Sequence, residues 1–145
     1  MKVLIDTNVY LSYILAPDRQ GVIPAVVHAC LTLDEIDLIV PPDQLVEFTG
    51  KAATKRYFRD RIPKSAMDDF VAQLKALGEL QPPPEDAAIY SRDPKDDYLI
   101  AYGVINEADY LITGDQDLLV LQRAGQLLIV TPAAFLSVLQ NKDLV

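Results

Sequence analysis

Short apolar runs alternate along the chain with longer stretches in which apolar residues recur every three or four positions. The short runs are typical of buried strands, and the longer stretches are typical of helices with one buried face. The pattern predicts strands at residues 2–5, 38–40, 110–112 and 127–130. It predicts helices at residues 9–15, 22–33, 43–57, 63–77, 97–106 and 117–123, and from Pro132 onward.

The alternation of strands and helices indicates the fold class. Strands separated by helices form a parallel sheet with helices on both faces. We therefore expect an α/β fold of three layers (α/β/α) around a central, mostly parallel sheet of four or five strands. Residues 82–84 are all proline and predict a stiff loop rather than a domain boundary. A chain of 145 residues suffices for one core, so a single domain is expected over residues 1–145.

Acidic residues stand where the predicted elements meet. Asp6 directly follows the first strand, and Asp115 follows the strand at 110–112. The pair Asp96-Asp97 opens a predicted helix instead. Because active sites in parallel sheets lie beyond the carboxyl ends of the strands, these acids are candidates for one shared site.

Helix capping offers a simpler explanation for each acid, since an Asp at an N-cap is typically worth about 1 kcal/mol. It explains Asp6 poorly, because Thr7 and Asn8 follow and can cap without a carboxylate. We expect the converged carboxylates to have no Lys or Arg among them. Two carboxylates about 4 Å apart then repel by roughly 4 kcal/mol at an effective dielectric constant of 20. That repulsion favours a hard cation such as Mg²⁺ or Mn²⁺.

Other catalytic machinery is missing from the sequence. It has no Gly-x-Ser-x-Gly elbow, no Gly-rich phosphate loop and no Cys/His set for zinc. His28 is the only histidine and is expected to be packed or half-exposed on an apolar helix. Cys30, the single cysteine, is expected in the core and fits a reducing compartment. No apolar run approaches the roughly 20 residues of a membrane span, so we expect a cytoplasmic protein without membrane contact.

The charge is unevenly distributed. A net charge of −8 argues against a general nucleic-acid binder. However, six of the thirteen basic residues fall within residues 51–64, which contain one acid, Asp60. This basic run is either a solvated helix face or a local anion-binding surface. The nucleic-acid-binding candidates within it are Lys51, Lys55, Arg56 and Arg59.

Three segments together resemble the motifs of PIN-domain ribonucleases. They are residues 3–8 (Val-Leu-Ile-Asp-Thr-Asn), residues 93–101 (Asp-Pro-Lys-Asp-Asp-Tyr-Leu-Ile-Ala) and residues 111–119 (Leu-Ile-Thr-Gly-Asp-Gln-Asp-Leu-Leu). The subgroup that the chain resembles is the toxin component of toxin–antitoxin systems. The resemblance implies a metal-dependent endoribonuclease that cleaves RNA with Mg²⁺ or Mn²⁺. It also implies a possible antitoxin protein as inhibitor and a possible homodimer.

The resemblance assigns the catalytic acids. Asp6 matches the first acid of the family and Glu47 the second, on the helix after the second strand. The third acid falls on Asp96 or Asp97, and counting back from residues 99–101 favours Asp96 slightly. Asp115 matches the fourth acid.

The resemblance also implies the metal ligands and their supports. Asn8 is a companion of the first acid, and Thr113 has the position of a supporting hydroxyl. The implied metal ligands are Asp6, Asp96, Asp97, Asp115 and Asp117.

Two alternatives belong to other functional classes. A phosphoacceptor signalling domain also has an acidic pocket and Mg²⁺ at strand ends, but it needs an acceptor Asp and a late Lys at those ends. Here Pro41-Pro42 and Thr131-Pro132 follow the corresponding strands. The second alternative is a PIN fold that binds nucleic acid without turnover.

Overall fold

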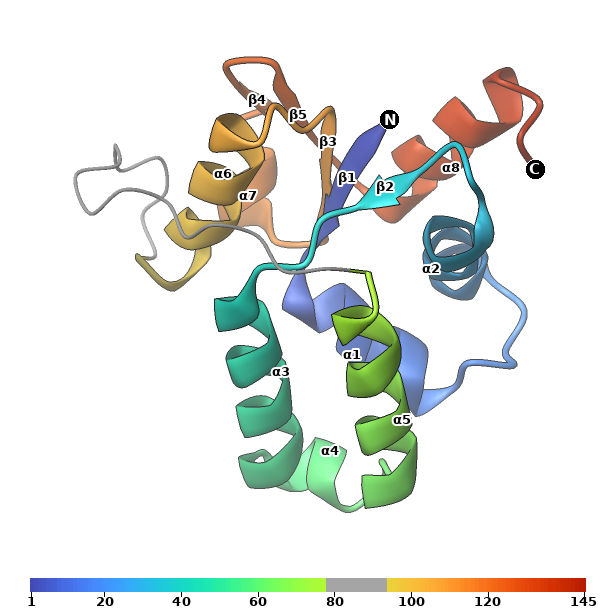
Figure 1. The fold of residues 1–145 in the computed structure, drawn as a ribbon, viewed down its shortest axis with the longest axis vertical. Helices are drawn as coiled ribbons and strands as arrows, with labels where there is room; N and C mark the ends of the chain where they lie inside the picture. The colour runs from blue at the N-terminus through green and yellow to red at the C-terminus, as the bar shows by residue number, and fades with distance from the viewer. Residues whose placement is uncertain (78–93) are drawn as a thin grey trace.

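The structure, a computed structural model, describes residues 1–77 and 94–145 (Figure 1). Within these ranges five strands form one sheet: β1 (Lys2–Ile5), β2 (Asp37–Leu38), β3 (Tyr110–Ile112), β4 (Arg123–Ala124) and β5 (Leu127–Val130). The helices of the same ranges are α1 (Thr7–Leu15), α2 (Val22–Thr32), α3 (Pro42–Thr54), α4 (Arg56–Arg59), α5 (Lys64–Lys75), α6 (Pro94–Ile105), α7 (Gln116–Leu119) and α8 (Pro132–Asn141).

The sheet has the strand order β2-β1-β3-β5-β4. β1 pairs in parallel with both β2 and β3, and β3 pairs in parallel with β5. Only β4 is antiparallel, beside β5 at the edge. Ile5 and Ile112, the last residues of β1 and β3, are paired, so the carboxyl ends of these two strands lie side by side.

Helices cover both faces of the sheet. Val3 and Ile5 belong to a core shared with α1, α2, α3, α5 and α8, whereas Leu4 belongs to a core shared with α6 and α7. This alternation is the two-residue period of a strand that is buried on both faces. Figure 1 shows α6 and α7 on one side of the strands and α2 and α8 on the other. The predicted three-layer α/β/α fold is therefore confirmed.

Several predicted elements differ from the structure. The helix expected at 97–106 begins earlier, at Pro94, and the strand expected at 38–40 is Asp37–Leu38. The helix expected at 117–123 is wrong in its second half, because α7 ends at Leu119 and Arg123-Ala124 form β4. Gly125, with φ of 59°, allows a two-residue turn that pairs Ala124 with Leu127. The helix expected at 43–57 is interrupted at Lys55, whose backbone is extended.

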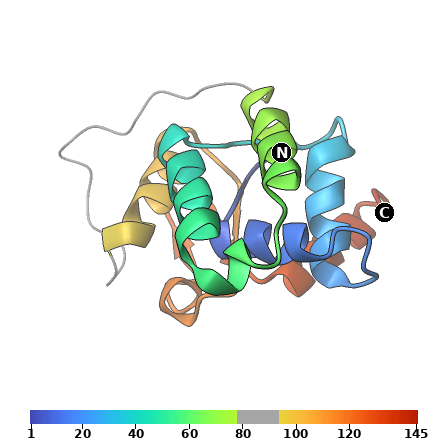
Figure 2. The ribbon, with the colours of Figure 1, turned by 90° about the horizontal axis from the view of Figure 1, so that it is seen from below.

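The helices α3, α4 and α5 form a hairpin beyond the carboxyl end of β1. Figures 1 and 2 show α3 and α5 side by side with the short α4 between them, and α1 contacts both. The basic run at 51–64 therefore covers the end of α3, all of α4 and the start of α5. In the described ranges, no helix has the length and apolar character that a membrane span requires.

Candidate active site

Asp6 lies at the junction of β1 and α1. Its backbone N–H donates to the Ile112 carbonyl across the sheet at 2.9 Å. Although Asp6 occupies the N-cap position of α1, its side chain makes no capping hydrogen bond. The Thr113 hydroxyl instead donates to Asp6 Oδ2 at 2.7 Å, and Asp6 is only 4% exposed. Capping therefore does not account for this carboxylate.

The surroundings of Asp6 raise the pKa of its carboxyl group. The largest cause is burial, which penalises the charged form. The hydrogen bond from Thr113 lowers the pKa, the negative charge of Glu47 raises it, Lys51 lowers it, and Asp115 raises it further. The ionised form is thus costly here unless a cation lies close by.

Asp115 is connected to Asp6 through Thr113, which is fully buried. The backbone N–H of Asp115 donates to the Thr113 hydroxyl at 3.0 Å. Asp115 Oδ1 accepts from the backbone N–H of Asp117 at 2.9 Å and so caps α7. Asp117 is exposed. Among the described residues, only its backbone N–H takes part in this network, and its carboxylate does not.

Glu47 joins the site from α3. The Tyr98 hydroxyl on α6 donates to Glu47 Oε2, and Lys51 Nζ lies 3.1 Å from Glu47 Oε1. Lys51 Nζ also donates to Asn8 Oδ1 at 3.4 Å. The expectation that no Lys or Arg lies among the carboxylates is therefore wrong. One turn of helix separates Lys51 from Glu47, and this spacing brings the ammonium group into the site.

Sequence reasoning missed two residues that organise the site, Gln44 and Tyr98. Gln44 is buried, and its amide donates to the Ile5 carbonyl and to the Thr7 hydroxyl, which fixes the chain on both sides of Asp6. The spacing of Gln44 from Glu47 is i, i+3, which puts both on one face of α3 and was a usable signal. Tyr98 directly follows the acid pair, but its contact with Glu47 spans 51 positions and has no local signature.

Asp6, Asn8 and Asp115 open onto a pocket of about 400 Å³. This acid pocket is completed by side chains of α1, α2 and the start of α8. Its further lining residues are Val9, Ser12, Ile23, Gly114 and Pro132. The pocket gives solvent and ligands access to carboxylates that are otherwise enclosed.

The oxygen ligands fit a hard divalent cation. Asp6 and Asp115 line one pocket, and the negative charge of Asp115 contributes to the raised pKa of Asp6. Among the side chains that the structure describes, those of residues 1–77 and 98–145, no group of three or more His, Cys, Asp or Glu is close enough to hold a metal. The side chains of Asp96 and Asp97 lie outside the described residues. The helix that carries them, α6, contacts β1 and β3.

Comparison with models of protein families shows the family to which the chain belongs. The model of the PIN domain matches residues 2–117, which include Asp6, Glu47 and Asp115. The chain belongs to the PIN-domain family. PIN domains are nuclease-type folds that generally depend on divalent metal ions, so this chain is of the hydrolase type with nucleic acid as its class of substrate. Searches of curated proteins and of solved structures gave no match.

The remaining predicted residues lie away from the acid pocket of this PIN domain. Lys55, Arg56 and Arg59 are exposed at and around α4. Arg56 Nε and Arg59 Nε lie 3.6 Å and 3.5 Å from the Asp60 carboxylate, which partly neutralises them. His28 is exposed on α2, more so than its apolar surroundings in the sequence suggested.

Proposed function

We propose that this PIN domain is a metal-dependent endoribonuclease that hydrolyses RNA phosphodiester bonds with Mg²⁺ or Mn²⁺. The observation that carries the proposal is the buried Asp6 carboxylate, which faces the same pocket as Asp115 and has a raised pKa. A carboxylate kept in such surroundings suits a site that a cation completes.

The proposed metal ligands are Asp6, Asp115 and one or both of Asp96 and Asp97, with Asp117 as an outer ligand. A bound Mg²⁺ or Mn²⁺ would supply positive charge to the scissile phosphate and would activate the attacking water. Thr113 holds Asp6 and the backbone of Asp115 in a fixed relation through two hydrogen bonds. Its hydroxyl thereby orients the Asp6 carboxylate and fixes the backbone of Asp115 before substrate arrives.

We assign Glu47 to orienting the attacking water. Tyr98 and Lys51 each contact a different oxygen of its carboxylate, which restricts the side chain to one orientation. Each oxygen keeps a further lone pair that can accept from a water molecule. The hydrogen bond from Lys51 Nζ to Asn8 Oδ1 further restrains the lysine side chain.

We propose that Lys51, Lys55, Arg56 and Arg59 attract the RNA backbone to this side of the molecule. Lys51 is beside the acids, and the other three side chains are solvent-exposed around α4. Replacing Lys55, Arg56 and Arg59 together should weaken RNA binding and reduce its salt dependence. An unchanged salt dependence would show that these residues are a solvated face.

A circular RNA tests the proposed reaction directly. The purified protein, with Mg²⁺ or Mn²⁺, should linearise a circular single-stranded RNA and leave a circular single-stranded DNA of the same sequence intact. Linearisation requires an internal cut, so an exonuclease would leave the circle unchanged. Binding of the circle without linearisation in either metal would favour a PIN fold that binds nucleic acid without turnover.

We further propose one nuclease domain over residues 1–145 that acts in the cytoplasm as the toxin of a toxin–antitoxin pair. Phe135 and Leu139 of α8, beyond the matched residues, complete the core shared with α2 and thus support one domain. An antitoxin protein would inhibit the enzyme, and the chain would form a homodimer. Induced expression should arrest growth in wild type but not in Asp6→Asn. Light scattering of the purified protein tests the dimer.

A further inference from the structure

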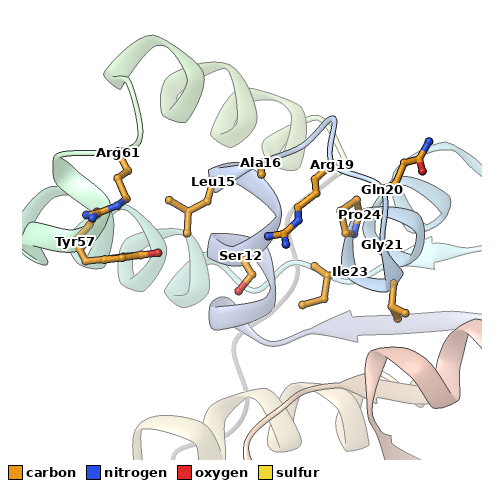
Figure 3. A pocket seen from close by; sticks show the side chains of 11 residues that line it. Ser12, Leu15, Ala16, Arg19, Gln20, Gly21, Ile23, Pro24, Tyr57 and Arg61 are labelled. Carbon is orange, nitrogen blue, oxygen red and sulfur yellow. The ribbon is translucent and has the colours of Figure 1, made fainter.

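A second and larger pocket adjoins the acid pocket. It has a volume of about 890 Å³, within the range of roughly 300–1,000 Å³ that is usual for ligand sites. Ser12 and Ile23 border both pockets, so the larger one, here called the side pocket, begins where the acid pocket ends. Its walls come from the end of α1, the segment leading into α2, and α4 with the residues that follow it (Figure 3).

The charge of the side pocket is opposite to that of the whole chain. Among its described lining residues only Arg19 and Arg61 are charged, in a protein of net charge −8. With the described side chains of residues 1–77 and 98–145 neither arginine forms an ion pair, whereas Arg56 and Arg59 both contact Asp60. The side pocket therefore offers cations that are not neutralised by described neighbours.

An exposed aromatic ring lies between these cations. Tyr57 is 56% exposed, and Figure 3 shows its hydroxyl end and the Arg19 guanidinium pointing toward one another across the pocket. The Arg61 guanidinium lies 4.0 Å from the centre of the Tyr57 ring, and Arg61 Nη1 donates to the Tyr57 carbonyl at 3.0 Å. These two contacts hold Arg61 in place against the ring.

Arginines beside an exposed aromatic ring match the chemistry of a single-stranded nucleotide. Bases of single strands stack on aromatic side chains or on guanidinium planes, and Arg side chains contact the phosphates. A base inside a duplex cannot stack on a side chain in this way, so the side pocket fits an unpaired strand.

We propose that the side pocket binds one or two nucleotides of single-stranded RNA next to the scissile phosphate. Tyr57 stacks on a base, while Arg19 and Arg61 contact the backbone. This inference rests on the proposed function, since it extends the substrate path away from Asp6 and Asp115. It makes Arg19, Tyr57 and Arg61 binding residues, none of which lies in a motif of the catalytic acids.

Binding in EDTA, where RNA stays intact, measures the side pocket separately from cleavage. The full chain is titrated into a labelled eight-nucleotide single-stranded RNA and followed by fluorescence anisotropy. Tyr57→Ala should weaken binding about 5-fold or more, and Tyr57→Phe should bind like wild type, because stacking needs the ring alone. Arg19→Ala and Arg61→Ala should each lower the slope of log K against log salt by about 0.7.

Lys142→Ala is the matched control, because it also removes one exposed positive charge but lies at the end of α8, outside both pockets. It should leave the affinity and the salt slope unchanged. Thermal melting of each variant confirms that the fold is intact. A duplex RNA of the same length should bind more weakly than the single strand.

The outcomes separate the two proposals. Equal RNA affinity in wild type, Tyr57→Ala and Arg19→Ala would overturn the side pocket as a nucleotide site, even if RNA is cleaved. Absence of RNA binding, or equal loss in Lys142→Ala, would overturn it as well. A loss of RNA affinity in the pocket variants but not in Lys142→Ala would support the side pocket as a nucleotide site. That support would hold even if wild type bound RNA without cutting it in either metal, because a failure to cut contradicts only the proposed function.

Discussion

At the scale of the residue, Asp6 combines burial with two negative neighbours, and the consequence is a dependence of stability on pH. Its pKa is raised chiefly by burial, so folding favours the protonated form. The stabilising contribution is fully present below the ordinary Asp value of about 3.9 and is lost as pH rises through the higher pKa of the folded state.

Asp6→Asn should therefore be more stable than wild type at pH 7 in EDTA, because Asn accepts the Thr113 hydrogen bond without a charge. The advantage should shrink as pH falls through the raised pKa of Asp6 in the folded state, and it should be largely gone below about 4, where the wild-type carboxyl is neutral in both states. Urea unfolding of both proteins between pH 3.5 and 8 measures the difference. An advantage that stays constant over this range would contradict the electrostatic account.

Tyr98 gives a second test at this scale. Burial first, and then the Glu47 carboxylate, raise the pKa of its hydroxyl well above the ordinary value, so it remains a hydrogen-bond donor at neutral pH. Tyr98→Phe should lower RNA cleavage by about 10-fold or more, since a hydrogen bond to a charged group is worth roughly 1.5–3 kcal/mol. Cleavage rates at saturating metal test this expectation.

Tyr102→Phe is the matched control on the same helix. The Tyr102 hydroxyl is buried and has no hydrogen-bond partner among the described residues. Its removal should leave cleavage unchanged. If Tyr98→Phe were as active as Tyr102→Phe, Tyr98 would have no role in positioning Glu47.

The sequence places Asp6 and Asp115 at strand ends, and the structure puts both on one pocket. The sequence alone could not show that Lys51 lies against Glu47 or that Gln44 supports the turn at Asp6. Those contacts depend on how α3 is rotated and tilted against β1, which no local pattern encodes. The roles of the site residues remain predictions.

At the scale of the element, α6 depends on close approach to the sheet. A Cβ atom at Gly103 would lie 2.8 Å from a Leu127 methyl carbon and 3.1 Å from one of Leu4. Gly103→Val should therefore destabilise the protein by about 1–3 kcal/mol, because the larger side chain overpacks this contact. Since α6 carries Asp96 and Asp97, cleavage should also fall. Chemical unfolding measures the first effect.

Gly50→Ala in α3 is the control for helix propensity. A Cβ atom at Gly50 would meet nothing within 4 Å. This substitution should stabilise by up to about 1 kcal/mol, as expected for Gly to Ala in an exposed helix. Equal effects of the two substitutions would show that α6 does not pack tightly through Gly103.

Element boundaries followed from the sequence where caps and prolines mark them, as at Pro132, which begins α8. The pattern failed at Arg123-Ala124, where a helical period continues but the chain forms β4. Pairing with β5 across the turn at Gly125 makes this segment a strand. A strand of two residues is too short to show a period in the sequence.

At the scale of the whole molecule, a cation at the acid pocket should stabilise the fold. A ligand that binds only the folded state at 100 times its Kd adds about 2.7 kcal/mol, which raises Tm. Mn²⁺ or Mg²⁺ should therefore raise the Tm of wild type at pH 7, and EDTA should reverse the increase. Asp6→Asn should show a much smaller increase. Equal metal responses in the two proteins would place the metal elsewhere.

The fold class was predictable because strands and helices alternate over the chain, and the PIN-domain match agrees with it. The antiparallel edge strand and the side pocket were not. Arg19, Tyr57 and Arg61 come together only when α4 folds back toward the segment that leads into α2. The proximity of these three residues depends on the hairpin of α3, α4 and α5. The charge pattern of the sequence alone could indicate only a basic run.

The central claim is that Asp6 and Asp115 hold a metal for RNA hydrolysis. The most direct measurement is the rate of RNA cleavage with Mg²⁺ or Mn²⁺ by wild type, Asp6→Asn and Asp115→Asn. We predict cleavage by wild type that stops in excess EDTA, and a loss of at least about 100-fold in each variant with the fold intact. Cleavage that persists in EDTA or in Asp6→Asn would contradict the claim.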